Sequence, residues 1–475
     1  MSRFRSLLKT QAFASGVAQP YREMRHVHVT KRPFVLAYVQ MSSEPFSLWA
    51  CRYGRGVTST GYIVVPEPRN HEDQNAAFAA FAEVLLKDVR AALADDLEPL
   101  QLWVSNGGAA ANLKRLGRVM RARHISDEVS YAGAVLDVYA QSADAPGSAL
   151  CISATEALSR HRATGQSDFE DANLASQLVW WDRALLARIS PAVSVPMAVA
   201  MSTFTAAGEA EKMAMGTQTT PTVDTRLLEP EIMKLSAARR NSAPVDEIEQ
   251  GLADLLHDQV TPIWNAIWCA HEQLLTLSET GSADDRWASD STMFRRQIEW
   301  LDGGNHRRFV DSPLQAARLL SGWEASHTDT LRQATIEDDL AFVEAVSDGK
   351  AVIGTVSKVD VRKVGGTKHP FVSLDVQAVT LTVGTEVWWR ANDEISGTVR
   401  SIAEAADGAT MEIEVTGGVR KYKNAMPAVG QIVGFHALPP PFPRRPRMPK
   451  QLPWTHARRV DDTLDLDDGG VSDAN

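Results

Sequence analysis

Between residue 33 and about residue 190, apolar runs of strand length alternate with stretches of helical spacing. Three apolar runs come first, at residues 34–40, 46–53 and 58–65, and glycines between the second and third favour a hairpin turn. A helix is expected at residues 72–93, where one face collects alanine, phenylalanine, leucine and valine. The pattern therefore begins with an antiparallel meander followed by a helix.

The second half of this region continues to alternate. A buried-type strand is expected at residues 100–104 and a helix at residues 109–121, after an Asn-Gly-Gly break. Further strands are predicted at residues 134–139 and 149–153, and a long closing helix at residues 168–189. A strand that follows a helical crossover must join the sheet in parallel, so the sheet is expected to be mixed.

The pattern then changes twice. Residues 195–225 hold few large apolar side chains and are predicted to be a linker. Residues 226–348 show helical spacing throughout, with start signals at Thr261-Pro262 and at Asp311-Ser312-Pro313. From residue 350 to residue 438 the apolar period becomes two, which is typical of strands.

Glycine pairs separate the strands of this last region. Gly365-Gly366, Asp407-Gly408 and Gly417-Gly418 are expected to be turns, and a V-G-x-x-V pattern occurs at residues 383–387 and 429–433. Several short strands with regular turns predict a small antiparallel β-barrel.

Charge and cysteine content restrict the possible functions. The formal net charge of −10 excludes a uniformly basic coat for nucleic acid, although local basic patches are still allowed. The three cysteines are odd in number, far apart and without a CxxC pair, which indicates a reducing, cytoplasmic compartment and no thiolate zinc site. No apolar run reaches the length of a membrane span, so no membrane partner is expected.

The first region resembles a known fold family. The strand pair carrying Trp49-Ala50-Cys51-Arg52-Tyr53-Gly54-Arg55 and Thr60-Gly61-Tyr62, the alanine-rich helix after Asp73, and the segment at residues 165–175 are similar to parts of the RNase H-like fold. The resemblance covers about a third of the chain. It implies a metal-dependent nuclease in which four carboxylates hold two magnesium ions.

The acids that this resemblance requires are missing from most of their expected positions. The first strand holds no Asp or Glu, Asn106 stands after the fourth strand where the family has an Asp, and Asn173 occupies the position most like the last ligand. Amides replace carboxylates poorly around Mg²⁺, so we predict an inactive domain with no catalytic residue and no cofactor. The alternative is a Mg²⁺-dependent nuclease with displaced acids. Its catalytic residues would be Glu72, Asp73, Asp168 and Asp171.

The second half of the chain resembles a different family. Residues 348–354, Val383-Gly384-Thr385-Glu386-Val387-Trp388-Trp389 and Leu452-Pro453-Trp454-Thr455-His456 are similar to the region before the motor of bacterial superfamily-1 helicases related to the nonsense-decay helicase, over about residues 285–456. In that family a β-barrel contacts the nucleic acid. No G-x-x-x-x-G-K-[ST] loop occurs here, so ATP hydrolysis is not expected.

Basic and aromatic residues in and after the barrel are candidates for nucleic-acid contact, because single strands bind through stacking beside cations. Adjacent Trp388 and Trp389 must point to opposite faces of a strand, so at most one belongs to the core. A His26-x-His28 pair shows no third metal ligand, and no metal site is predicted there. The candidate nucleic-acid-binding residues are Arg362, Lys363, Lys368, Trp388, Trp389, Arg390, Lys421, Tyr422, Lys423, Arg444, Arg445 and Arg447.

Together these patterns predict a multi-domain α+β protein. The expected parts are a flexible basic arm (1–32), an RNase H-like domain with a mixed sheet (33–194), a linker (195–225), a helical domain (226–348), a β-barrel (349–438) and a disordered tail (439–475), proline-rich and basic at first and then acidic. The predicted function is a non-catalytic nucleic-acid-binding subunit, acting with a separate helicase or nuclease in genome processing or anti-phage defence. The alternatives are the metal-dependent nuclease and a protein–protein scaffold.

Overall fold

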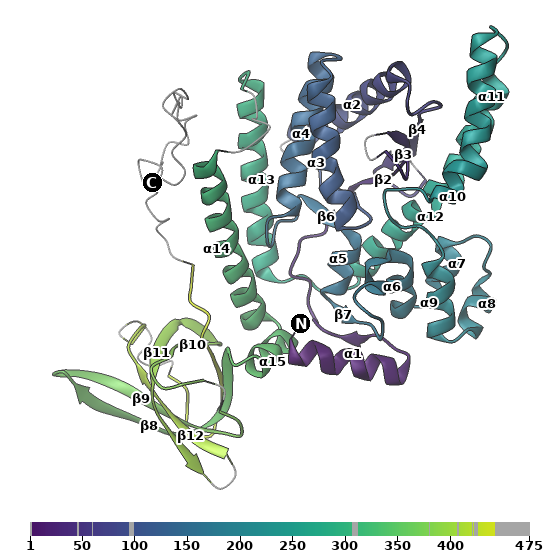
Figure 1. Ribbon diagram of the computed structural model, residues 1–475. Helices are drawn as coiled ribbons and strands as arrows, with labels where there is room; N and C mark the ends of the chain where they lie inside the picture. The colour runs from purple at the N-terminus through teal and green to yellow at the C-terminus, as the bar shows by residue number, and fades with distance from the viewer. Residues whose placement is uncertain are drawn as a thin grey trace.

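A computed structural model describes residues 2–44, 47–58, 60–94, 99–305, 312–379, 381–405, 408–419, 421 and 426–441. The fold combines a mixed sheet surrounded by helices with a separate closed barrel of strands. Figure 1 shows the barrel at one end of the molecule, next to the last helices before it, while the sheet lies among the helices at the other end. The predicted combination of a mixed sheet, helices and a small antiparallel barrel is confirmed.

The mixed sheet has five strands in the order β4-β3-β2-β5-β6. They are β2 (Phe34–Gln40), β3 (Leu48–Gly54), β4 (Thr60–Val64), β5 (Leu102–Val104) and β6 (Cys151–Ser153). The first three pair antiparallel, whereas β5 joins β2 in parallel and β6 joins β5 in parallel. The predicted meander with later parallel additions is therefore confirmed.

Helices cover both faces of this sheet. One face carries α2 (His71–Ala94), α3 (Gly107–Ala122) and α4 (Asp127–Ala143), and the other carries α12 (Asp246–Leu275). On the first face the Tyr38 hydroxyl donates to the carbonyl of Ala109 at 2.7 Å. On the second face the Arg52 guanidinium lies over the Trp264 ring at 4.9 Å. Period-two strands thus send alternate side chains to two helical layers.

The strand predicted at residues 134–139 is wrong, because this segment belongs to α4. Ser126 caps the helix by accepting a hydrogen bond from the Val129 N–H at 3.2 Å. Val135, Leu136 and Tyr139 are all fully buried, since α4 packs between other helices and the sheet. A helix buried on several sides has a continuous apolar run, which cannot be distinguished from a buried strand by periodicity.

The predicted closing helix at residues 168–189 is broken into three short pieces. These are η1 (Glu170–Ala172), α6 (Leu174–Trp181) and α7 (Leu185–Ile189). Asn173 and Asp182 have extended backbone angles and interrupt the helical path. Both side chains accept hydrogen bonds from backbone N–H groups two or three residues later, which is how Asn and Asp compete with helix continuation.

The prediction of a flexible arm at residues 1–32 is also wrong. Residues Arg3–Ser15 form α1, which Ser2 caps, and β1 (Gln19–Pro20) pairs with β7 (Arg162–Ala163). Lys9 forms an ion pair with the buried Asp171 at 3.1 Å. Lys9, Arg22 and Arg25 of this segment have acidic partners in the folded chain, which sequence composition does not reveal.

The predicted linker at residues 195–225 is helical and packed. It forms α8 (Val195–Ala200), α9 (Thr203–Glu211), α10 (Pro221–Val223) and the start of the π-helical η2 (Asp224–Leu228). Ala206, Ala207 and Ala210 are buried, and α9 packs against α6. The small side chains that indicated a linker instead allow close approach of the two helices.

The helical region at residues 226–348 has the predicted character. It contains α11 (Glu229–Arg240), α12, α13 (Gly281–Asp302), α14 (Pro313–Glu337) and α15 (Asp339–Ser347); the short α5 (Ala154–Ser159) lies earlier in the chain. The predicted start of α14 is confirmed, since Ser312 and Gln315 form a reciprocal capping box. The predicted start at Thr261-Pro262 is wrong, because α12 continues through Pro262 and buries Ile263 and Trp264 immediately after it.

The barrel closes in the order β10-β11-β12-β9-β8-β13, and each described pair is antiparallel. Its strands are β8 (Ala351–Val364), β9 (Thr367–Val376), β10 (Glu386–Trp389), β11 (Asn392–Ala405), β12 (Gly408–Val415) and β13 (Ile432–His436). Gly365 and Gly366 both have positive φ, at 55° and 88°, as the predicted two-residue hairpin turn requires.

The barrel is fastened to α14 and α15 at one end. The Arg390 guanidinium donates to the carbonyls of Thr335 and Ile336, each at 3.1 Å, and lies 4.7 Å from the centre of the Phe342 ring. The Phe342 ring covers Gly434, where an added Cβ would lie 2.4 Å from it. The barrel keeps its own apolar core, whereas buried apolar residues between Ala12 and Leu301 form one continuous cluster.

Within the described part of the chain, no helix combines the length and the apolar character that crossing a membrane requires.

Candidate functional site

One candidate position for a ligand lies at the carboxyl ends of the neighbouring strands β2 and β5, in the middle of the sheet. The chain leaves β2 toward β3 and β4 and then crosses back to add β5 on the other side. In open sheets with helices on both faces, ligands bind outside the carboxyl ends of the strands where the chain direction reverses in this way. Gln40 ends β2 here, and Ser105-Asn106 follows β5.

Gln40 is 2% exposed, and its Oε1, backbone N–H and carbonyl all form hydrogen bonds within the chain. Its Oε1 accepts from Asn112 Nδ2 at 2.7 Å, and its backbone N–H donates to the Thr217 carbonyl at 2.7 Å. Its carbonyl accepts from both the backbone N–H and the hydroxyl of Thr219, each at 3.0 Å. An amide whose oxygen already accepts from Asn112 therefore stands at the end of β2.

Asn106 and Asn173 have matching double roles. The Oδ1 of Asn106 accepts from the Ala109 N–H at 2.8 Å, which caps α3, and its Nδ2 donates to the Met215 carbonyl at 3.2 Å. The Oδ1 of Asn173 accepts from the Ser176 N–H at 3.0 Å, which caps α6, and its Nδ2 donates to the Met213 carbonyl at 3.0 Å. At both positions where the RNase H-like resemblance implies a carboxylate, an amide binds backbone.

The four acids of the alternative nuclease prediction lie in two pairs with different partners. Glu72 is exposed in the first turn of α2, while Asp73 accepts from the Glu67 N–H at 3.1 Å and from Arg239 Nη1 at 2.9 Å. Lys9 Nζ lies 2.9 Å from Asp168 and 3.1 Å from Asp171. This hydrogen bond from Lys9 lowers the pKa of Asp168, so it stays ionised beside a cation.

These pairs do not assemble into one metal site. Among the described residues, the group of three or more His, Cys, Asp or Glu side chains close enough to hold an ion contains none of these four acids. Each pair instead has a lysine or arginine where a metal ion would provide the positive charge.

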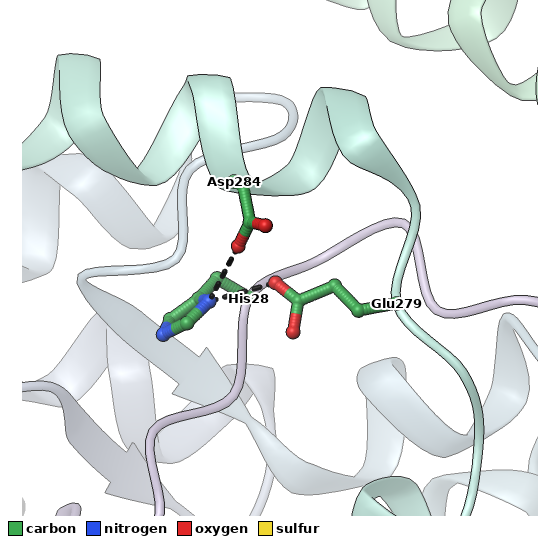
Figure 2. Close-up of side chains that lie close together, drawn as sticks. All are labelled: His28, Glu279 and Asp284. Carbon is green, nitrogen blue, oxygen red and sulfur yellow. Dashed lines mark hydrogen bonds and ion pairs between the residues drawn. The ribbon is translucent and has the colours of Figure 1, made fainter.

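The group that the structure does bring together is His28, Glu279 and Asp284, shown in Figure 2. His28 Nδ1 lies 2.7 Å from Glu279 Oε1 and 3.6 Å from Asp284 Oδ1. Glu279 also receives an ion pair from Arg25, and the His28 ring stacks on Trp287 at 4.9 Å between centroids. The sequence offered His28 as part of a His-x-His pair but gave no sign that residues 279 and 284 would lie beside it.

The donor arrangement of this group fits an ion-pair cluster better than a metal centre. Both carboxylates approach the same ring nitrogen, and a 2.7 Å contact to Glu279 is a hydrogen bond that places a proton on Nδ1. A protonated nitrogen cannot donate its lone pair to an ion. Because Arg25 already neutralises Glu279, the cluster fastens the N-terminal segment to the start of α13.

The tip of the β8–β9 hairpin carries two exposed cations among the barrel candidates. Lys363 and Lys368 lie directly opposite each other, two positions from the Gly365-Gly366 turn, and both side chains are exposed. Neither forms an ion pair or a hydrogen bond with any residue that the structure describes. Val361 and Val364 beside them are 61% and 40% exposed.

Arg362 has partners already. Its guanidinium pairs with Asp360 at 3.0 Å and with Glu412 at 2.6 Å, and it covers the Phe371 ring at 4.5 Å. The hairpin therefore has one face where acids neutralise its arginine and one face where two lysines stand opposite each other.

The remaining described candidates lie at the other end of the barrel. Trp389 is 8% exposed and belongs to the barrel core, whereas Trp388 is half-buried and stacks on His436. The prediction that at most one of them is in the core is confirmed. Arg390 fastens the barrel to α14 and α15, and Lys421 pairs with Glu394 at 2.7 Å.

The barrel candidates thus form two separate groups. Trp389 pairs with Phe435, which pairs with Val352, so this group lies near the start of β8, while Lys363 is near its end. At about 3.3 Å per residue, the intervening strand is on the order of 30 Å long. Tyr422, Lys423, Arg444, Arg445 and Arg447, like nearly all of the predicted tail, lie outside the described residues.

Comparisons with known proteins add no family: no protein-family model, no curated protein and no solved structure matches this chain.

Proposed function

We propose that this protein binds nucleic acid without cleaving it, and that the tip of the β8–β9 hairpin contacts the phosphates. The observation that carries the proposal is the Lys363–Lys368 pair, exposed and directly opposed across the strands. Like charges directly opposite on a hairpin destabilise it, so the pair is unfavourable unless an anion binds between or beside the two ammonium groups. Figure 1 shows this hairpin pointing away from the rest of the chain, where a long ligand has access.

The hairpin places an apolar contact beside a cationic one. Lysine ammonium groups attract phosphates through a salt-dependent interaction. The exposed Val361, on the same face of β8 as Lys363, provides an apolar surface beside them for sugars and bases. A flexible single strand can satisfy both, so we expect tighter binding to single strands than to duplexes.

The RNase H-like identity of the leading domain is part of the same proposal. A three-stranded meander whose first strand is joined in parallel by two later strands is the sheet expected from that resemblance, and the order β4-β3-β2-β5-β6 supports it. Amides at positions 106 and 173, and cations beside Asp73 and Asp171, support a domain that does not hold catalytic magnesium.

The helicase resemblance supplies the proposed biological setting. A closed barrel attached to a helical region supports a helicase-type nucleic-acid-binding element without a motor. On this basis we propose that the protein acts beside a separate helicase or nuclease, in genome processing or anti-phage defence.

Binding is tested by titrating labelled single-stranded DNA, duplex DNA, RNA and an RNA–DNA hybrid at several salt concentrations. The double variant Lys363→Ala/Lys368→Ala should bind single strands at least about tenfold more weakly, and the slope of log affinity against log salt should decrease by about 0.7 per lysine. The matched control is Lys212→Ala/Lys234→Ala, which removes two exposed lysines from the helical part of the chain. Equal loss in both variants, or in neither, would contradict the hairpin site.

The same titrations with Mg²⁺ or Mn²⁺ test the absence of cleavage. We expect every substrate to remain intact. Metal-dependent cleavage that disappears in Asp168→Ala would replace this proposal with the nuclease alternative. Failure to bind any of the four ligands would instead favour a protein–protein scaffold.

A charge reversal separates binding from folding at the hairpin. Lys368→Glu places opposite charges across the strands at Lys363, so the hairpin should be at least as stable as in the wild type. Affinity for single-stranded DNA should nevertheless fall further than in Lys368→Ala, because an anion now faces the phosphates. Thermal melting and the same titration check the two effects; a variant that melts earlier and binds normally would refute both.

A further inference from the structure

The segment at residues 213–219 follows α9 and passes the carboxyl ends of β2 and β5, with bends at Met213, Gly216 and Thr217. Four of its backbone groups face these strand ends at alternate positions: the carbonyls of Met213, Met215 and Thr217, and the N–H of Thr219. Gln218 forms an isolated parallel bridge with Gln40, and Met215 and Thr219 are buried at 2% and 5% exposure. The segment is therefore bound to the sheet as an added strand binds, through its backbone.

The residues that hold this segment come from three different elements. Asn173 stands before α6, Asn106 stands before α3, and Gln40 ends β2. Each contributes a hydrogen bond to the segment, at 3.0 Å, 3.2 Å and 2.7 Å respectively. Three separate anchors on consecutive odd-numbered residues indicate a built binding path for this segment.

We propose that residues 213–219 are an intramolecular strap that covers the carboxyl ends of β2 and β5, and that residues 106 and 173 are amides because they must hold it. The strap occupies the place where this type of sheet accepts a ligand. While it is bound, neither a cation nor an extended chain reaches the ends of β2 and β5. This inference does not depend on the nucleic-acid proposal.

The chemistry of the two asparagines makes the proposal specific. Capping α3 and α6 needs only an oxygen that accepts from a backbone N–H, and aspartate caps a helix as well as asparagine. Binding the strap needs an N–H that donates to a carbonyl, which aspartate lacks. Asn106→Asp and Asn173→Asp therefore keep the caps and place a carboxylate oxygen against the Met215 and Met213 carbonyls.

Hydrogen–deuterium exchange of the double variant Asn106→Asp/Asn173→Asp tests this. Amides in peptides spanning residues 213–220 should exchange at least about tenfold faster than in the wild type, and trypsin should cleave faster after Lys212. Amides within α3 and α6 should exchange at unchanged rates. Asn241→Asp is the matched control, since Asn241 is exposed at the end of α11, and it should leave the strap unaffected.

A second variant tests the strap from its own side. The Thr219 hydroxyl lies between the Gln40 carbonyl and the Asp224 carboxylate and shares its one proton with them, so Thr219→Val removes both contacts with little change in shape. Exchange should again increase at residues 213–220. Unchanged exchange there in both variants would overturn the proposal, as would equally faster exchange throughout α3 and α6. Affinity of both variants for single-stranded DNA should match the wild type, so failure of the strap and failure of the hairpin site are distinguishable.

Discussion

Replacing Asp338 should destabilise the protein more than replacing any neighbouring acid, because this buried carboxylate joins two distant parts of the chain. Its Oδ2 accepts from the backbone N–H groups of Glu23 and Met24 at 2.8 and 2.9 Å, and its Oδ1 accepts from the Ala341 N–H at 3.0 Å. His26 lies 3.5 Å away. Asp338 thus links the N-terminal segment to the start of α15, which carries the barrel.

The size of the effect follows from the donors that would be left without an acceptor. Asp338 is 1% exposed, and a hydrogen bond to a charged group contributes about 1.5–3 kcal/mol. Since the three bonds are coupled and water can enter, Asp338→Ala should lower the free energy of unfolding by about 3–6 kcal/mol. The free energy of unfolding of Asp338→Asn should lie between those of wild type and Asp338→Ala, because its one amide oxygen can accept from either α15 or the N-terminal segment but not both.

Thermal melting and urea unfolding followed by circular dichroism measure this, with Asp339→Ala as the matched control. Asp339 is the next residue, its side chain is 76% exposed, and it forms an ion pair with Arg390 at 2.6 Å. Exposed pairs of this kind contribute about 0–1 kcal/mol, so the control should lose far less stability.

The pH dependence gives an independent check. Burial alone raises the pKa of Asp338, but hydrogen bonds from His26 and from the N–H groups of Met24, Ala341 and Glu23 outweigh it and hold that pKa well below its usual range. A carboxylate with a lowered pKa stabilises the fold above the pKa of the unfolded chain, about 3.9, and this contribution is lost as the pH falls below it. The difference in free energy of unfolding between wild type and Asp338→Ala should therefore become smaller below about pH 4. If Asp338→Ala lost no more free energy of unfolding at pH 7 than Asp339→Ala, the reasoning would be refuted.

Two further predictions concern the barrel core and a buried histidine. Trp389→Ala should lower the free energy of unfolding of the barrel by about 3–5 kcal/mol, because Trp389 lies in the barrel core. Trp388 lies at the far end of the barrel from the hairpin tip, so Trp388→Ala should leave DNA affinity within about twofold of wild type. Burial lowers the pKa of His161 to about 4, so the folded protein binds fewer protons than the unfolded chain between about pH 6.5 and 4, and stability should decrease as the pH falls through this window. Urea unfolding at each pH should show that the free energy of unfolding depends less on pH in His161→Gln than in the wild type.

The sequence predicted best the parts of the fold that depend on local pattern. Glycine pairs with alternating valine, leucine and isoleucine gave the barrel, since Gly365-Gly366 can adopt the positive φ angles that a tight hairpin needs. The capping signal Ser312-Pro313 located the start of α14. In these places the chemistry of neighbouring residues is enough to determine the conformation.

Prediction failed where the reason for a conformation lies elsewhere in the chain. Residues 134–139 look like a strand because α4 is buried by helices and the sheet, and burial of that kind is a tertiary property. The basic N-terminal segment is ordered by Asp171, Glu344 and Asp338, which are more than one hundred residues away in the sequence. No local rule connects those positions.

The strap was missed for the same reason. Apart from Met213 and Met215, residues 213–219 have small or polar side chains, which is the composition of a linker, and the strap is bound mainly through its backbone. The amides at positions 106 and 173 could be recognised as departures from the RNase H-like pattern, but their donor role became visible only when Met213 and Met215 lay opposite them.

The partners of the acids bear on whether the leading domain can hold a metal at all. Lys9 comes from α1 and Arg239 from α11, and each places a cation next to carboxylates that the nuclease alternative needs. A magnesium ion at either pair would have to displace a side chain that already carries positive charge. Gln40, Asn106 and Asn173 add amides and no carboxylate. Lys9→Ala would remove one cation but would not create a four-carboxylate site, because Asp168 and Asp171 do not lie in one group with Glu72 and Asp73. Lys9→Ala should therefore lose stability without gaining Mn²⁺ affinity by calorimetry, and a gain in affinity would show that the two acids alone suffice for a metal site.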